Sequence, residues 1–520
     1  MKKFLVVCAV VFLCSAILGC GGAGAGGGDG GGGGGTTTTQ EKKFWAQNVS
    51  TGTSYQLDAQ LLASNTRCEV WVEKGSAVTE AAARNVASEF NNVYTKLMNT
   101  TTGLGWQLNI DGRQTNTMQF ADMLGDGNQK LIILLLDIRD GYTNEGDPYV
   151  AGYFDGVQFF DDSTAQTVDR RSNECDMIYM DINPSVIGPS FYGTLAHEMQ
   201  HLMNFVTSVL LIGNEIRDSF MDLWIDEGLS AAAEWIYSGQ LDESRIAWYH
   251  NDPTGFIAQG DNFFVWDNYS DPSAVLNDYA TVNLFFHWLR LNNPIGGELF
   301  KHILLSEYTS VYHDYRTITG LFTSESPWSK WETMIGDWHA ANFIKNPNSS
   351  RWGYKNVTLL NSFKTHYMTE GLTTVNLFPG EGVFSHAPST NYSGADPISF
   401  LYLTSSAIST TYSGTTNTLL TFNSKNTVDE PPVPVPGATT GLVPPANVKA
   451  SISGTRVAIK PESYRVSAGD MLRRNGHNFN PSSFAPVPNN NTGRSVIIDS
   501  KPIPRINAGD LPNVKLTLKD

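Results

Sequence analysis

The residues best suited to chemistry in this sequence are two histidines and a glutamate in the segment 194–203, which reads TLAHEMQHLM. His197 and His201 are four residues apart, so both side chains lie on one face of an α-helix and can bind one metal ion. Imidazole is a good zinc ligand, and two histidines leave room for a third protein ligand and a water molecule. Glu198 stands beside His197, where its carboxylate can accept a proton from that water. The spacing predicts a catalytic zinc site.

The alternative is a chance match to this pattern on a surface helix. The residues that flank the histidines are apolar, among them Leu195, Ala196, Leu202 and Met203. Such flanks are more typical of a helix that is buried beside a cleft than of a solvated helix. The composition around the motif therefore favours the metal site.

A catalytic zinc site needs a third protein ligand. The extended pattern His-Glu-x-x-His-x-x-Gly-x-x-His fails here, because Asn204 and Thr207 occupy its last two fixed positions. Glu227 is the best placed alternative, since it lies in a predicted helix, 224–235, and Gly228 after it allows a neighbouring backbone to approach closely. We expect Glu234 to be a solvated carboxylate or one that contacts a ligand, rather than a ligand of the metal itself. The acidic candidates downstream of the motif are Glu215, Asp218, Asp222, Asp226, Glu227 and Glu234.

Strands and helices that alternate along the chain must position these residues. Pro184 and Pro189 break the chain before the helix that carries the motif, which we expect to begin near Ser190. The segment 149–154 is a candidate edge strand, although an ordinary interior strand is equally compatible with its sequence. An edge strand beside the metal can bind an extended peptide as one further strand. Other predicted strands are 66–72, 130–138, 176–181 and 398–403, and other predicted helices are 79–98, 276–291 and 328–343.

The N-terminus has the features of an export signal. Lys2 and Lys3 precede the apolar segment 4–18, and the residues from Ile17 to Cys20 resemble a bacterial lipobox, in which the cysteine carries lipid. The alternatives are an ordinary secretory peptide or a membrane anchor, but the apolar run is short for a full span. We expect a lipoprotein of the bacterial cell envelope, held at the outer membrane or cell surface through lipid on Cys20.

The chain has 520 residues, which is enough for two or more domains. Its formal charge of −16 argues against nucleic acid as a partner. No feature of the sequence specifies an oligomeric state. The expected organisation is a signal peptide in 1–20, a flexible Gly/Thr-rich tether in 21–40, a catalytic domain in 41–355, a β-rich region in 356–428, a Pro-rich linker in 429–446 and a small β module in 447–520.

Only two cysteines are expected to keep free side chains in the exported protein. Cys8 and Cys14 would leave with the signal peptide and Cys20 would carry lipid, so Cys68 and Cys175 remain. A disulfide between them and a pair of buried thiols are both compatible with an exported location.

The motif and the segment that follows it resemble a known arrangement. His197 to His201, followed by Asp226-Glu227-Gly228, is similar to the gluzincins, in which a glutamate on a second helix completes the zinc site. The sequence further resembles the hyicolysin-type neutral zinc metallopeptidases over about 65–344, most specifically over 149–235, and not in the tail. The segments that carry this resemblance are 134–138, 150–155, 172–174, 194–198 and 226–230.

The resemblance implies an α+β fold, in which a gluzincin-like catalytic domain combines a mixed sheet with a helical active-site region. It also implies Zn²⁺ as the cofactor and proteins or peptides as substrates. A catalytic tyrosine stands at the start of a similar helix in related aminopeptidases, so we prefer Tyr279 as the donor to the developing oxyanion. A core tyrosine bonded near the helix cap is the alternative, and His250 and Tyr269 are other candidate donors. We expect His287 to be a packed core histidine.

The predicted function is that of a membrane-anchored zinc endopeptidase with Glu198 as general base. The Gly-x-Met-Glu-Asn motif of the related aminopeptidases is absent, which favours cleavage inside chains. One alternative is an exopeptidase of the same clan. Another is a non-catalytic surface lipoprotein or adhesin that keeps the fold, but the intact Glu198 argues against it.

The lipobox interpretation predicts that Cys20→Ala releases the protein from membranes, because lipid on Cys20 is the expected anchor. The measurement is the fraction of protein that sediments with membranes after a salt wash. Cys14→Ala is the matched control and should sediment like the wild type. A Cys20→Ala protein that still sediments would contradict the interpretation.

Overall fold

The computed structural model describes residues 40–98 and, with interruptions, 108–425; the longest interruptions are 116–129, 206–220 and 264–275, and those of five residues are 310–314, 369–373 and 393–397. The predictions for 1–39 and for 426–520 lie outside the described residues, and so do Glu215, Asp218 and Tyr269. These undescribed predictions comprise the signal peptide, the tether, the linker and the C-terminal β module.

A six-stranded mixed sheet forms the first half of the fold, with the order β1-β2-β3-β6-β8-β7. Strands β3, β6 and β8 are parallel to one another, whereas β1, β2 and β7 pair antiparallel with their neighbours. Every residue of β6 is buried, as expected for a central strand covered on both faces. The bounds are β1 Glu41–Asn48, β2 Thr53–Ser64, β3 Cys68–Glu73, β6 Leu131–Leu136, β7 Gly152–Phe154 and β8 Met177–Asp181.

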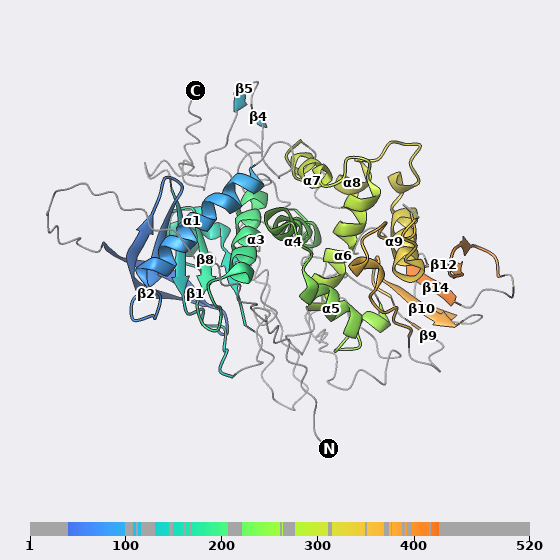
Figure 1. Ribbon diagram of the computed structural model, residues 1–520, viewed down its shortest axis with the longest axis horizontal. Coiled ribbons are helices and arrows are strands. Elements are labelled where there is room, and N and C mark those ends of the chain that lie inside the picture. Colours follow the sequence, from blue (N-terminus) through green and yellow to red (C-terminus); the bar gives the residue numbers. More distant parts are fainter. Residues whose placement is uncertain are drawn as a thin grey trace, which may run out of the picture.

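Helices α1 (Glu80–Leu97) and α3 (Pro189–Phe205) cover one face of this sheet (Figure 1). Helix α1 begins as its sequence predicts, because the Thr79 side chain accepts a hydrogen bond from the backbone N–H of Ala82. The apolar side chains of α1, α3 and this sheet face form one continuous core. A second, smaller cluster that includes Phe44, Trp71 and Tyr153 fills the opposite face.

Among the described residues, strand β7 lies at the edge of the sheet and pairs only with β8. It is shorter than the predicted strand 149–154, since the ladder covers only Gly152–Phe154. A Cβ atom on Gly152 would lie 3.1 Å from the Tyr179 carbonyl oxygen and 3.2 Å from the Thr194 Cγ2 atom of α3. The glycine therefore allows α3 to pack closely against the edge strand.

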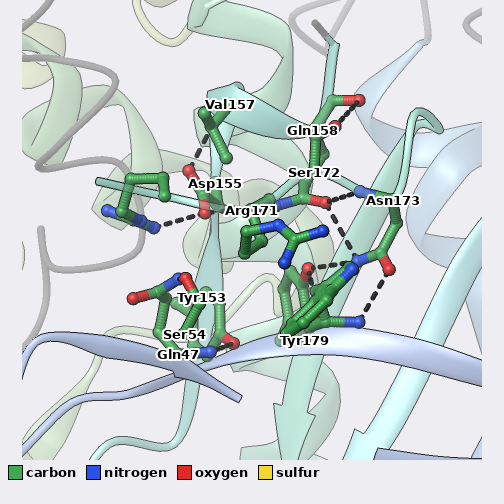
Figure 2. A network of polar contacts seen from close by, with 12 residues as sticks. Gln47, Ser54, Tyr153, Asp155, Val157, Gln158, Arg171, Ser172, Asn173 and Tyr179 are labelled. Carbon is green, nitrogen blue, oxygen red and sulfur yellow. Dashed lines mark hydrogen bonds and ion pairs between the residues drawn. The ribbon is translucent and has the colours of Figure 1, made fainter. Parts of the chain in front are cut away.

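A buried polar network fixes the chain just after β7 (Figure 2). Asp155 forms an ion pair with Arg170 and accepts a hydrogen bond from the backbone N–H of Val157. Burial raises the pKa of Asp155 to about 6 although the Arg170 charge lowers it. The Gln158 side chain accepts a hydrogen bond of 2.7 Å from the backbone N–H of Asn173. These contacts hold the edge strand in place from its C-terminal end.

The second half of the fold is helical. Helix α4 packs between α3 and α6 (Figure 1). Its Gly228 faces α6 so closely that a Cβ atom there would lie only 2.2 Å from the Phe286 ring. Replacement of this glycine would therefore separate the two helices. The bounds are α4 Leu223–Ser238, α5 Glu243–Asn251, α6 Leu276–Asn292, α7 Glu298–Thr309, α8 Tyr315–Thr319 and α9 Trp331–Ile344.

A four-stranded antiparallel sheet with the order β10-β14-β12-β13 packs against α9. The ring of Phe422 lies against Gly336 of α9, where a Cβ atom would approach it to 2.9 Å. The sheet consists of β10 Gly382–His386, β12 Ile398–Leu403, β13 Ile408–Ser409 and β14 Thr418–Asn423. The minor elements are α2 Asp162–Gln166, the hairpin of β4 Leu108–Ile110 and β5 Arg113–Thr115, and the pair of β9 Thr374–Val375 and β11 Asn391–Tyr392.

The described residues contain both mixed sheet and helix, in agreement with the α+β class. Cys68 and Cys175 are both buried and are not joined by a disulfide, so the structure selects two thiols. Within the described residues, no helix combines the length and the apolarity needed to cross a membrane.

Candidate metal centre

Helix α3 carries the His-Glu-x-x-His residues into the interior. His197, Glu198 and His201 are 4%, 1% and 2% exposed, so the motif lies on a buried helix and not on a surface helix. Proline begins the helix at position 189, where its missing N–H is not needed and its backbone angle suits a first turn. The chance-match alternative is thus disfavoured by burial.

Helix α4 brings Glu227 to the two histidines. One ligand atom from each of His197, His201 and Glu227 can be chosen so that all three lie within 4.8 Å of one another. The Glu227 Oε2 atom is 3.3 Å from His197 Nε2 and 3.5 Å from His201 Nε2. The two helices therefore bring these three side chains together.

These residues fit a zinc ion by the chemistry of their donor atoms. Two imidazole nitrogens and one carboxylate oxygen form a common set of protein ligands at catalytic zinc. The Nε2 atom of His197 and the Oε2 atom of Glu227 are buried, and neither makes a hydrogen bond within the described residues. Buried polar atoms of this kind are normally satisfied, and a shared cation would satisfy both of them.

Carboxylates hold the far side of each histidine. Glu234 Oε1 lies 2.7 Å from His197 Nδ1, and Asp226 Oδ2 lies 3.1 Å from His201 Nδ1. The Ser230 hydroxyl is a further neighbour of His201 Nδ1, at 3.2 Å. A hydrogen on Nδ1 leaves the Nε2 lone pair directed at the metal position, which is the usual arrangement at metal-binding histidines.

The carboxylate of Glu198 lies in the same buried region. Burial raises its pKa to about 7, while the charges of His201 and His197 and the backbone N–H of Phe154 on β7 lower it. No hydrogen bond of ordinary geometry within the described residues meets either of its oxygens. A cation at the metal position would favour the ionised carboxylate and lower this pKa.

Tyr279 reaches the site from the first turn of α6. Its hydroxyl donates a 3.3 Å hydrogen bond to Glu227 Oε1, and the side chain is buried. Burial raises the pKa of Tyr279 well above its usual value, and the Glu227 charge raises it further, so the phenol stays protonated. The tyrosine is therefore a hydrogen-bond donor beside the predicted metal ligands.

Other candidates lie away from the metal position. His250 is exposed in the last turn of α5, which does not favour it as a donor to a buried oxyanion. Asp222 stands at the start of α4 and accepts a hydrogen bond from the Trp224 indole, so it has a structural role. His287 is buried against Trp235 and accepts a hydrogen bond from Arg290, as expected for a packed core histidine.

Sequence reasoning missed the roles of two residues. Asp226 was considered only as a candidate metal ligand, whereas its side chain contacts the far nitrogen of His201. Arg245 was not considered, although its guanidinium contacts Glu234. Asp226 could have been found from the helical spacing of α4, but no motif marks Arg245.

The chain is similar to a known protease. It is 28% identical over 270 residues to the neutral metalloprotease ShpI of Staphylococcus hyicus, and the match covers 51% of this chain and 54% of that protein. The chain therefore matches only about half of the length of this relative. No protein-family model matches the chain. The similarity supports a relationship to metalloproteases, which agrees with the group of two histidines and a glutamate.

The geometry predicts that Glu227→Ala weakens zinc binding by orders of magnitude, because one of three protein ligands and its negative charge are lost. Glu234→Ala should weaken it less, by about 10- to 100-fold, since that residue acts on His197 and not on the metal. The measurement is zinc per protein after dialysis against a mild chelator. Glu243→Ala, on the exposed start of α5, is the control and should retain zinc. Full zinc in Glu227→Ala together with loss from Glu234→Ala would contradict the ligand assignment.

Proposed function

We propose that this protein is a zinc-dependent endopeptidase with His197, His201 and Glu227 as metal ligands. The observation that carries the proposal is the convergence of these three side chains beside the buried carboxylate of Glu198. The similarity to a neutral metalloprotease supports peptide bonds as the bonds that are cleaved. Cleavage within chains and attachment to the cell envelope through Cys20 are finer parts of the proposal, and they rest on the sequence motifs alone.

Zinc bound at this position would lower the pKa of a coordinated water and polarise the peptide carbonyl group. Glu198 is placed to accept the proton that this water loses and to pass it to the leaving amine. Its surroundings suit both steps, because burial favours the neutral carboxyl group and a cation at the metal position would favour the carboxylate.

Tyr279 is the proposed donor to the carbonyl oxygen. Negative charge develops on that oxygen in the transition state, and a positioned donor stabilises it by about 3 kcal/mol. The phenol is close to the ligand set, and its raised pKa keeps the proton available. Its hydrogen bond to Glu227 can hold the ring ready before substrate binds.

The edge strand β7 is the proposed binding site for the substrate backbone. Within the part of the chain that the structure describes, it pairs with β8 on one side only, and it lies beside α3. A peptide added there as a further strand would form backbone hydrogen bonds with little dependence on its sequence. The proximity of Phe154 to Glu198 supports this placement, because it brings the edge strand to the proposed general base.

Glu198→Gln tests the proposed chemistry. We expect it to retain zinc, since every proposed ligand is present, and to lose at least about 100-fold in kcat, because the base is gone. The measurements are casein cleavage and zinc content on the same preparation. Wild-type protein treated with a chelator and then reloaded with zinc is the control. A metal-replete variant that keeps a tenth of the wild-type turnover would show that Glu198 is not the base.

Tyr279→Phe tests the donor. The expected result is a kcat lowered by roughly 100-fold or more with a much smaller change in KM, because the phenol acts mainly on the developing oxyanion. Steady-state kinetics on a peptide with a blocked N-terminus measure both constants. Zinc content is the control, because Tyr279 also contacts the proposed ligand Glu227. An unchanged kcat would remove Tyr279 from the mechanism.

A further inference from the structure

Arg245 connects the candidate metal centre to helix α5. The side chain of Asp242 caps this helix by accepting hydrogen bonds from the backbone N–H groups of Ser244 and Arg245, at 2.8 and 3.3 Å. The cap places Arg245 in the first turn, with its side chain 16% exposed and directed toward α4. Its Nε atom lies 3.0 Å from Asp242 Oδ2, so the helix cap also holds the guanidinium.

One carboxylate oxygen stands between this guanidinium and a predicted metal ligand. Glu234 Oε1 accepts a hydrogen bond of 2.6 Å from Arg245 Nη2 and lies 2.7 Å from His197 Nδ1. The glutamate is therefore held from both sides. Hydrogen bonds between charged groups are the stronger ones, and a planar guanidinium fixes direction as well as distance.

The same guanidinium also faces the proposed oxyanion donor. Its central carbon lies 5.5 Å from the centroid of the Tyr279 ring, within the range of a cation–π contact. The hydroxyl of that ring donates to Glu227. Arg245 thus reaches the candidate centre by two routes, through Glu234 to His197 and through Tyr279 to Glu227.

We propose that Arg245 is a positioning residue, which holds Glu234 against His197 so that the imidazole keeps its Nε2 atom directed at the metal. The inference rests on the proposed zinc function, because it assigns Arg245 an effect on zinc affinity.

A purely structural role would have a different signature. If Arg245 only fastened α5 to α4, its loss would lower the stability of the fold and act independently of Glu234. If it acts through Glu234, its effect on zinc affinity should disappear once Glu234 is changed. Neighbouring residues that act together are non-additive in this way.

The test is the zinc dissociation constant of the full chain, measured by competition with a chelator. Arg245→Gln should weaken zinc binding by about 10-fold, and Glu234→Gln by about 10- to 100-fold. The double variant should bind zinc no more weakly than Glu234→Gln alone. Arg245→Lys keeps the charge but cannot hold both Glu234 and Asp242, so it should lie between Arg245→Gln and the wild type.

Arg290→Gln is the matched control. The guanidinium of Arg290 stacks at 4.1 Å on Trp235, which follows Glu234 on α4, but it donates its hydrogen bond to His287. The loss of Arg290 should therefore leave the zinc affinity within about twofold of the wild type. Thermal unfolding in excess chelator tests whether each variant is folded. If Arg245→Gln does not fold, the zinc affinity of Arg245→Lys is used in its place.

Two results would overturn the inference. One is wild-type zinc affinity in both Arg245 variants. The other is a double variant whose fold-loss of zinc affinity equals the product of the fold-losses in Arg245→Gln and Glu234→Gln. Failure of the wild-type protein to bind zinc would overturn the proposed function itself, and with it the inference.

Discussion

The structure depends on an excess of buried negative charge where α3 meets α4. Glu198, Asp226 and Glu227 are all less than 5% exposed, and Glu234 adds a further partly buried carboxylate. Charges that are removed from water need a partner, since an unpaired buried charge destabilises a fold by several kcal/mol. Without a metal, protons on the two histidines and on Glu198 reduce the excess. Burial lowers the pKa of His197 and of His201, but the neighbouring carboxylates outweigh burial and raise both. A divalent cation would take the place of these protons, so metal binding and folding are coupled in this account.

Two close approaches between elements bring the charges together. Gly152 lets α3 lie against the edge strand, and Gly228 lets α4 lie against α6. Both helices thereby occupy positions in which their ligand atoms meet and Tyr279 of α6 lies within hydrogen-bonding distance of Glu227. The network around Asp155 stabilises the end of edge strand β7, which packs against the helix that carries His197 and His201.

Local patterns in the sequence were enough to predict most of the elements and to propose candidate metal ligands. The helix after Thr79 follows from its apolar spacing. Helical periodicity places His197 and His201 on one face, whereas the prediction of Glu227 rested on its place in a second helix before Gly228 and on the resemblance to the gluzincins. The contact of Arg245 with Glu234 could not be predicted, because it depends on how α5 packs beside α4. The same reason applies to Cys68 and Cys175, since only the packing of distant strands decides whether two thiols meet.

The central claim is that two imidazoles and one carboxylate of this chain bind one zinc ion. X-ray absorption at the zinc edge of the metal-loaded full chain tests it most directly. The account predicts one zinc surrounded by nitrogen and oxygen at about 2.0–2.2 Å, with the outer-shell scattering of two imidazole rings. A sulfur shell at about 2.3 Å would place the metal on cysteine, and an all-oxygen shell without imidazole scattering would place it on surface carboxylates. Either result would contradict the account.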